Sequence, residues 1–111
     1  MRLDGLLRRV TSLIVSSCDP EKIVLFGSYA KGHENADSDV DILVIGDFQV
    51  SSFLLGQELR QLLHSCPIRI DLHVVTLREV EGESPKPYGF LSSILSSGQL
   101  LYLKRGTSRV S

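Results

Sequence analysis

The chain has 111 residues, of which 42% are hydrophobic and 23% charged, and a formal net charge of −1. These values fit one small folded domain and give no electrostatic reason to expect binding to nucleic acid or to a membrane surface. No apolar run is long enough to span a bilayer, and the two cysteines, Cys18 and Cys66, form no Cys-x-x-Cys pair. We therefore expect a single domain over residues 1–104, a polar C-terminal tail over residues 105–111 and a reducing, cytoplasmic location, with both cysteines in the core.

The chain begins with a helical pattern that is followed by a short apolar strand. Apolar residues recur at helical spacing between Leu3 and Ile14 and predict an amphipathic helix that ends before Asp19-Pro20, because the residue before a proline avoids the helical conformation. The run from Ile23 to Phe26 is wholly apolar, which is typical of a strand buried on both faces.

The Gly27-Ser28 pair after this strand is a candidate anion site. If residues 28–31 begin a helical turn, backbone amides and the Ser28 hydroxyl would point at a ligand at the strand end. The alternative is an ordinary strand-to-loop turn without a ligand.

Two aspartates introduce the next apolar segment, which runs from Val40 to Ile45. Successive strand side chains point to opposite faces, so Asp39 and Asp41 are expected to project together, away from the core. Neighbouring carboxylates repel each other and are costly near a core unless a cation compensates them. A hard divalent cation with oxygen ligands is the natural compensator.

The rest of the chain predicts two more helices and two more strands. A helix is expected from Ser51 or Ser52 to Pro67, a strand from Ile68 to Thr76, a short helix from Pro87 to Gly98, and a last strand from Gln99 to Leu103. The apolar stripe of the first of these helices is expected to contain Leu55, Leu59, Leu62 and Leu63. The predicted fold class is α/β (α+β), a small mixed sheet of about four strands flanked by three to four helices.

A third aspartate lies inside the predicted strand from Ile68 to Thr76. Alternation places Asp71 on one face with Arg69 and His73, although an aspartate in mid-strand is disfavoured by propensity. Such exceptions tend to occur at functional sites. Three carboxylates on neighbouring strands can hold two magnesium ions about 3.5–4 Å apart, as in phosphoryl transfer, with the Gly-Ser turn holding the triphosphate.

These motifs resemble a known family. Gly27-Ser28 in GSYAKG, followed by Asp39 and Asp41 in SDVDILV, resembles the signature of the minimal nucleotidyltransferases (MNT), a branch of the polymerase-beta-like superfamily. Asp71 occupies the place of the third carboxylate, and the segment ILSSGQLLYLK is similar to the end of the family's domain. The resemblance implies a nucleotidyltransferase fold and metal-dependent transfer of a nucleoside monophosphate, AMP from ATP, with two Mg²⁺ ions.

The resemblance also implies roles for single residues. Asp39 and Asp41 would bind both metals, and Asp71 would bind the metal nearer the nucleophile and accept its proton. Gly27 and Ser28 would contact the β- and γ-phosphates. Lys31 would add positive charge there, although a solvated surface lysine is the alternative.

The resemblance further implies a protein partner. A small MNT protein lacks a domain to bind the acceptor, so the expected acceptor is a HEPN-type RNase toxin whose tyrosine is AMPylated. This chain would then be an antitoxin, alone or in a homo- or hetero-oligomer.

Two other readings stay open. In the first, the chain would be a binding subunit that neutralises its partner without catalysis. In the second, its acids would be structural, with Asp41 or Asp71 paired to Arg69. For Arg69 and His73 themselves, salt-bridging or packing is favoured over substrate contact, and no histidine-based zinc site is indicated.

Overall fold

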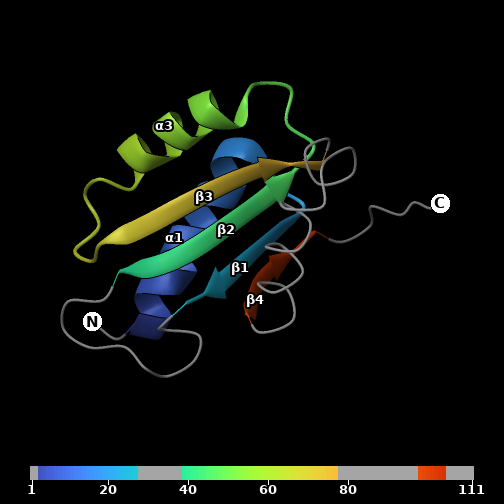
Figure 1. Ribbon diagram of the computed structural model, residues 1–111. Helices are drawn as coiled ribbons and strands as arrows, with labels where there is room; N and C mark the ends of the chain where they lie inside the picture. Colours follow the sequence, from blue (N-terminus) through green and yellow to red (C-terminus); the bar gives the residue numbers. More distant parts are fainter. Residues whose placement is uncertain (1–2, 28–38, 78–97, 105–111) are drawn as a thin grey trace.

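The structure, a computed structural model, describes residues 3–27, 39–77 and 98–104 (Figure 1). The described elements are α1 (Leu3–Cys18), β1 (Lys22–Phe26), β2 (Val40–Gly46), α3 (Ser52–Leu62), β3 (Ile70–Thr76) and β4 (Gln99–Leu103). The predicted helix from Pro87 to Gly98 lies almost entirely outside the described residues, as does the predicted tail. Within the described part, two helices therefore accompany the sheet, slightly fewer than expected.

The four strands form one mixed sheet in the order β3-β2-β1-β4. Strand β1 pairs with β2 and with β4 in antiparallel fashion, whereas β2 and β3 run parallel. A parallel pair requires a crossover connection, and α3 lies in the segment that connects β2 to β3. The predicted α/β fold class and its four-stranded mixed sheet are confirmed.

The main core lies between the helices and one face of the sheet. Figure 1 shows α1 behind the sheet and α3 beside β3. The buried residues of this core include Val10, Ile14, Val40, Ile42, Val44, Leu55, Leu59 and Leu72. The other face of the sheet buries a smaller cluster of Val24, Leu43 and Ile45. Strands β1 and β2 are thus covered on both faces, as the apolar run of β1 predicts.

The helix ends differ slightly from those expected. Helix α1 ends at Cys18, and the Asp19 N–H then donates to the carbonyl oxygen of Val15 at 3.1 Å with Asp19 in a left-handed conformation, φ 52°. This agrees with the predicted end before Pro20. Helix α3 ends at Leu62 rather than near Pro67, because a turn follows in which the Cys66 N–H donates to the Leu63 carbonyl oxygen at 3.0 Å.

Leucine 62 was expected in the buried stripe of α3, and this expectation is wrong. Its side chain is 39% exposed, whereas Leu55, Leu59 and Leu63 are buried. The three buried leucines repeat at intervals of four residues along one line of the helix, and Leu62 lies beside that line on the solvent side.

Both cysteines are partly buried free thiols that pack against the core. The Cys18 thiol donates to the carbonyl oxygen of Ile14, with 3.5 Å between sulfur and oxygen. Burial, with the nearby charges of Asp19 and Glu58, raises the pKa of Cys18 to about 11. This thiol is therefore protonated at neutral pH and acts as a packing residue. Neither described helix is long and apolar enough to cross a membrane.

Candidate active site and metal centre

The pairing of β2 with β3 places two of the predicted carboxylates side by side. In this parallel pair Asp41 lies opposite Asp71 in the register. Val40 and Ile42 face the helices, so Asp41 between them points to the other face of the sheet. Asp41 is half-buried there and Asp71 is exposed. The sheet thus brings together two acids that are far apart in sequence.

A histidine completes this cluster. His73 lies two residues after Asp71 on β3, and its Nε2 is 3.4 Å from an Asp71 carboxylate oxygen. One ligand atom each of Asp41, Asp71 and His73 lies within 4.8 Å of the other two. The imidazole also packs against the Phe26 ring of β1, with ring centres 5.3 Å apart and a tilt of 58°. The alternation of β3 predicts His73 on the face of Asp71, and its contacts with Asp71 and Phe26 agree with the salt-bridging or packing role expected for it.

Gly27 lies directly beside the Asp41 carboxylate. It follows β1, whose last residue, Phe26, pairs with Asp41 on β2. Gly27 has φ +78°, and a Cβ at this position would overlap the Asp41 carboxyl group. Glycine is therefore needed for two reasons, the left-handed backbone and the close approach of the carboxylate. Of the predicted phosphate-binding residues, Gly27 is in the described part of the chain, whereas Ser28 and Lys31 are outside it.

Asp39 is held differently from the other two acids. Its Oδ1 forms an ion pair with the Arg69 Nε, and the two atoms are 3.2 Å apart. Both side chains are largely exposed. The Val40 N–H donates to the Arg69 carbonyl oxygen at 2.9 Å, which fixes the two strand ends against each other. Arg69 thus pairs with Asp39. The alternative in which the acids are structural predicts an ion pair of Arg69 with Asp41 or Asp71 instead. Asp39 is not among the three clustered ligand residues.

The cluster carries an excess of negative charge. Burial raises the pKa of Asp41, and the charge and hydrogen bond of Asp71 raise it further, while His73 acts in the opposite direction. Two carboxylates and an imidazole that converge on one point are a donor set that fits a divalent cation. A bound cation would remove the repulsion that raises the pKa of Asp41.

Two grooves lie near these strands, and only one of them contains predicted site residues. The first, of about 420 Å³, is lined by Asp39, Arg69 and Asp71 together with Arg60 and His64. Carboxylates and cationic side chains therefore line one groove beside β3, a surface suited to a phosphorylated ligand with its counter-ions.

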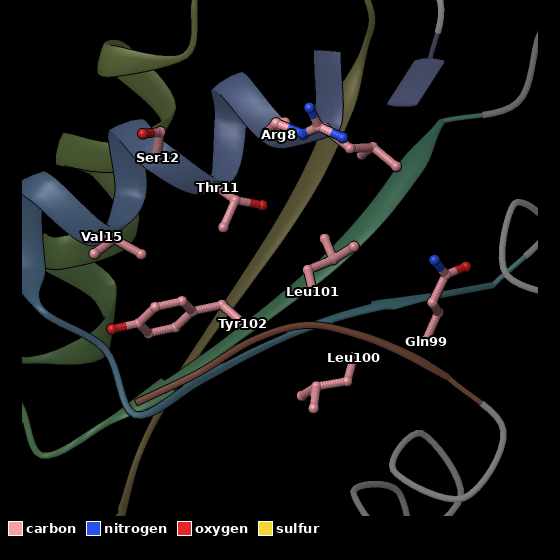
Figure 2. A pocket seen from close by; sticks show the side chains of 9 residues that line it. Arg8, Thr11, Ser12, Val15, Gln99, Leu100, Leu101 and Tyr102 are labelled. Atoms are coloured by element: carbon pink, nitrogen blue, oxygen red, sulfur yellow. The ribbon is translucent and has the colours of Figure 1, made fainter. Parts of the chain in front are cut away.

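The second groove has a volume of about 450 Å³ and lies between α1 and β4 (Figure 2). Arg8 and Thr11 of α1 face Leu101 and Tyr102 of β4 across it. It contains none of the predicted site residues. Because it lies on the side of the sheet that α1 covers, it is separated from Asp41 by the sheet itself.

Comparison with known proteins gives one family match over most of the chain. The profile of the family described as "Polymerase beta, Nucleotidyltransferase" matches residues 9–106. A protein of Methanocaldococcus jannaschii named "Putative protein adenylyltransferase" is 59% identical over 27 residues, which are 24% of this chain and 27% of that protein. The chain therefore aligns with only about a quarter of the length of this relative.

Similar folds occur among solved structures. A chain in the crystal structure of a toxin–antitoxin with AMP-PNP matches at a TM-score of 0.57 and 22% identity, over 90% of this chain and 76% of that one. A chain in a complex of the tri-AMPylated HEPN toxin of Shewanella oneidensis with an MNT antitoxin matches at a TM-score of 0.57 and 19% identity, over 94% and 75% respectively. At these identities the likeness is one of fold.

Proposed function

Because this chain belongs to the polymerase-beta nucleotidyltransferase family, we propose that it transfers a nucleoside monophosphate, AMP from ATP, to a hydroxyl group and releases pyrophosphate. The observation that carries this proposal is the pairing of Asp41 with Asp71 beside Gly27. Two carboxylates held together near the start of two neighbouring strands, against their mutual repulsion, are what a metal-dependent phosphoryl transfer requires.

In the proposed reaction, the acceptor oxygen attacks the α-phosphorus of the nucleotide while the bond from this phosphorus to the bridging oxygen breaks. Asp71, the more exposed acid, accepts the proton of the acceptor hydroxyl. Asp39, Asp41 and Asp71 would hold two Mg²⁺ ions, which when bound supply charge neutralisation for the phosphates. Asp39 would exchange its contact with Arg69 for this role.

The phosphate tail is proposed to lie at the end of β1. The left-handed conformation of Gly27 leaves no side chain between its backbone and a ligand beside Asp41. Gly27 and Ser28 would contact the β- and γ-phosphates, and Lys31 would add positive charge to them. Catalysis would then consist mainly of positioning and charge neutralisation.

The proposed acceptor is a hydroxyl on a partner protein, a tyrosine of a HEPN-type toxin, which would make this chain an antitoxin of the MNT type acting in the cytoplasm. Support comes from the fold shared with a chain in the complex of an AMPylated HEPN toxin with its MNT antitoxin. The short match to a relative named as a protein adenylyltransferase points the same way.

The test is a transfer assay with ATP labelled at the α-phosphate, Mg²⁺ and the protein that co-purifies with this chain. We expect label on the partner, and at least a hundredfold loss of labelling in Asp41→Asn and in Asp71→Asn. Asp47→Asn is the matched control, since Asp47 is exposed and outside the cluster. Labelling that survives in both cluster variants would show that these acids do not carry the reaction.

A binding subunit without catalysis is the second candidate function. It is favoured by an apolar surface at the start of α3, where Val50, Phe53 and Leu54 are 49%, 69% and 55% exposed. Exposed apolar side chains gathered in this way are typical of interaction surfaces. Complex formation that persists in Asp41→Asn but fails in Phe53→Ser, with no label transferred by the unsubstituted protein, would establish this function instead.

A further inference from the structure

We propose that His73 is a direct ligand of the ion held by Asp41 and Asp71, and that its imidazole makes this position favour a first-row transition-metal ion over Mg²⁺. The inference rests on the nucleotidyltransferase function proposed above and concerns one of the two ion positions. The three ligand atoms lie within 4.8 Å of one another, so small side-chain rotations bring them around a single ion.

The backbone brings the imidazole to this point. The parallel register places Asp41 opposite Asp71, and the alternation of β3 puts His73 on the same face as Asp71. His73 pairs in the register with Leu43, the next residue on β2 beyond Ile42. All three donors are thus carried by adjacent strands of one sheet, which is a more rigid support than a loop.

The distance between His73 and Asp71 favours shared ligation over a simple hydrogen bond. Nε2 and the carboxylate oxygen are 3.4 Å apart, longer than the usual N–H···O distance of about 2.7–3.2 Å. Two ligand atoms that each lie about 2.1 Å from one ion, at tetrahedral or octahedral angles, are roughly 3.0–3.4 Å apart. The observed spacing therefore matches that of two neighbouring ligands.

The imidazole is also oriented and accessible. Its ring packs against Phe26 at 5.3 Å, which restricts its rotation, and its side chain is 37% exposed, which leaves a path for an ion. Asp39, in contrast, forms an ion pair with Arg69. His73 is therefore better placed than Asp39 to be the third ligand of the ion, after Asp41 and Asp71.

The chemical consequence is a change in metal preference. Three carboxylates form an all-oxygen site that suits Mg²⁺, whereas a nitrogen donor binds first-row transition metals better than it binds Mg²⁺. Replacing an oxygen donor by imidazole therefore shifts the site towards first-row ions, by more for Co²⁺ than for Mn²⁺, which also accepts oxygen ligands readily.

The test compares the binding of two ions to three proteins. Mn²⁺ affinity is measured by electron paramagnetic resonance, and Mg²⁺ affinity by its competition with Mn²⁺, for the unsubstituted chain, His73→Gln and Asp47→Asn. We expect at least about a tenfold loss of Mn²⁺ affinity in His73→Gln with Mg²⁺ affinity nearly unchanged. Asp47→Asn, which removes an exposed carboxylate outside the cluster and the groove beside β3, is expected to leave both affinities unchanged.

A second readout concerns the ligand itself. The visible absorption of the Co²⁺-loaded protein is expected to change in His73→Gln, because a nitrogen donor is lost, and circular dichroism checks that the variant is folded. An equal loss of Mn²⁺ and Mg²⁺ affinity would show that His73 only positions Asp71, and unchanged affinities would remove it from the site. Either result overturns the inference, and so does an unsubstituted chain that binds no Mn²⁺.

The experiments distinguish a failure of this inference from a failure of the proposed nucleotidyl transfer. One outcome would overturn the inference and leave the proposed function standing. In it, label is transferred with Mg²⁺ in His73→Gln as in the unsubstituted chain, and the chain binds Mn²⁺ no more tightly than Mg²⁺. Binding of Mn²⁺ that depends on His73, without transfer of label, would support the inference and overturn the proposed nucleotidyl transfer.

Discussion

Gly27, at the end of β1, determines how closely the Asp41 carboxyl group approaches the backbone. Gly27 is in contact with the carboxyl group of Asp41, and its φ of +78° lies where L side chains are disfavoured. The same carboxyl group has a raised pKa, because it is partly buried and lies beside Asp71. A backbone conformation that glycine adopts readily and a pair of repelling carboxylates therefore meet at this point, and such perturbed carboxylates are typical of a site that binds a ligand.

Gly27→Ala is expected to damage this point in two ways. The left-handed conformation costs a residue with a Cβ about 1–2 kcal/mol, and the new methyl group must displace the Asp41 carboxylate. We expect a loss of stability of at least this size in urea unfolding, and a smaller rise in melting temperature on addition of Mg²⁺ or Mn²⁺.

Gly56→Ala is the matched control for this prediction. Its Cβ would lie 3.1 Å from the Arg60 Nη1, whereas the bond of Arg60 to the Leu72 carbonyl oxygen is made by Nη2, and alanine is favoured over glycine inside a helix. A stability change within about 1 kcal/mol and an unchanged metal response are expected. If both alanine variants behave alike, the approach of Gly27 to Asp41 does not limit the site.

At the scale of the element, α3 supports the strand that carries the acid and the histidine. Its first turn is capped by the Ser51 hydroxyl, which accepts a hydrogen bond from the Leu54 N–H at 3.1 Å. Towards its other end, Arg60 donates from Nη2 to the carbonyl oxygen of Leu72 at 3.0 Å. Leu72 lies between Asp71 and His73, so α3 is tied to the part of β3 that forms the cluster.

Ser51→Ala is expected to lower stability by about 1 kcal/mol, because the Leu54 N–H loses its partner at the start of the helix. In a chain of this size the melting temperature falls by roughly 4 °C, which calorimetry can measure. Ser16→Ala, on the exposed side of α1, is the control and is expected to be neutral or slightly stabilising. An unchanged melting temperature for Ser51→Ala would mean that tertiary packing alone holds this turn.

At the scale of the whole molecule, the clustered acids link stability to pH. The pKa of Asp41 is higher in the folded chain than its ordinary value, so the folded state binds this proton more tightly than the unfolded state does. The corresponding stability is present below about pH 4 and is lost as the pH rises through the folded-state pKa. Without metal, the folded protein therefore carries a cost at neutral pH that a bound cation would offset.

Asp41→Asn is expected to remove this cost. In the presence of a chelator the variant should melt above the unsubstituted protein at pH 7, with the difference shrinking towards zero near pH 4. Melting curves between pH 4 and pH 8 measure this, with Asp47→Asn as an exposed control. A variant that is less stable at every pH would show that the Asp41 carboxylate stabilises the fold. It would then not be a group that lowers stability in order to bind a cation.

Much of the fold follows from local patterns in the sequence. The helical spacing of α1, the apolar run of β1 and the alternation of β3 each predicted an element that the structure contains. The boundaries were less accurate, as the early end of α3 and the exposure of Leu62 show. Helix ends depend on which turn forms next, and periodicity alone does not determine that.

The composition of the site was only partly accessible in this way. The sequence by itself determined that Gly27, Asp41 and Asp71 stand at or next to strands, and that His73 shares a face with Asp71, because strand alternation is a local property. Only the tertiary structure decided that β2 and β3 run parallel with Asp41 opposite Asp71, that Arg69 holds Asp39, and that His73 reaches the carboxylates. Register and strand direction are set by packing between segments far apart in the chain, and no local spacing encodes the distance between their side chains.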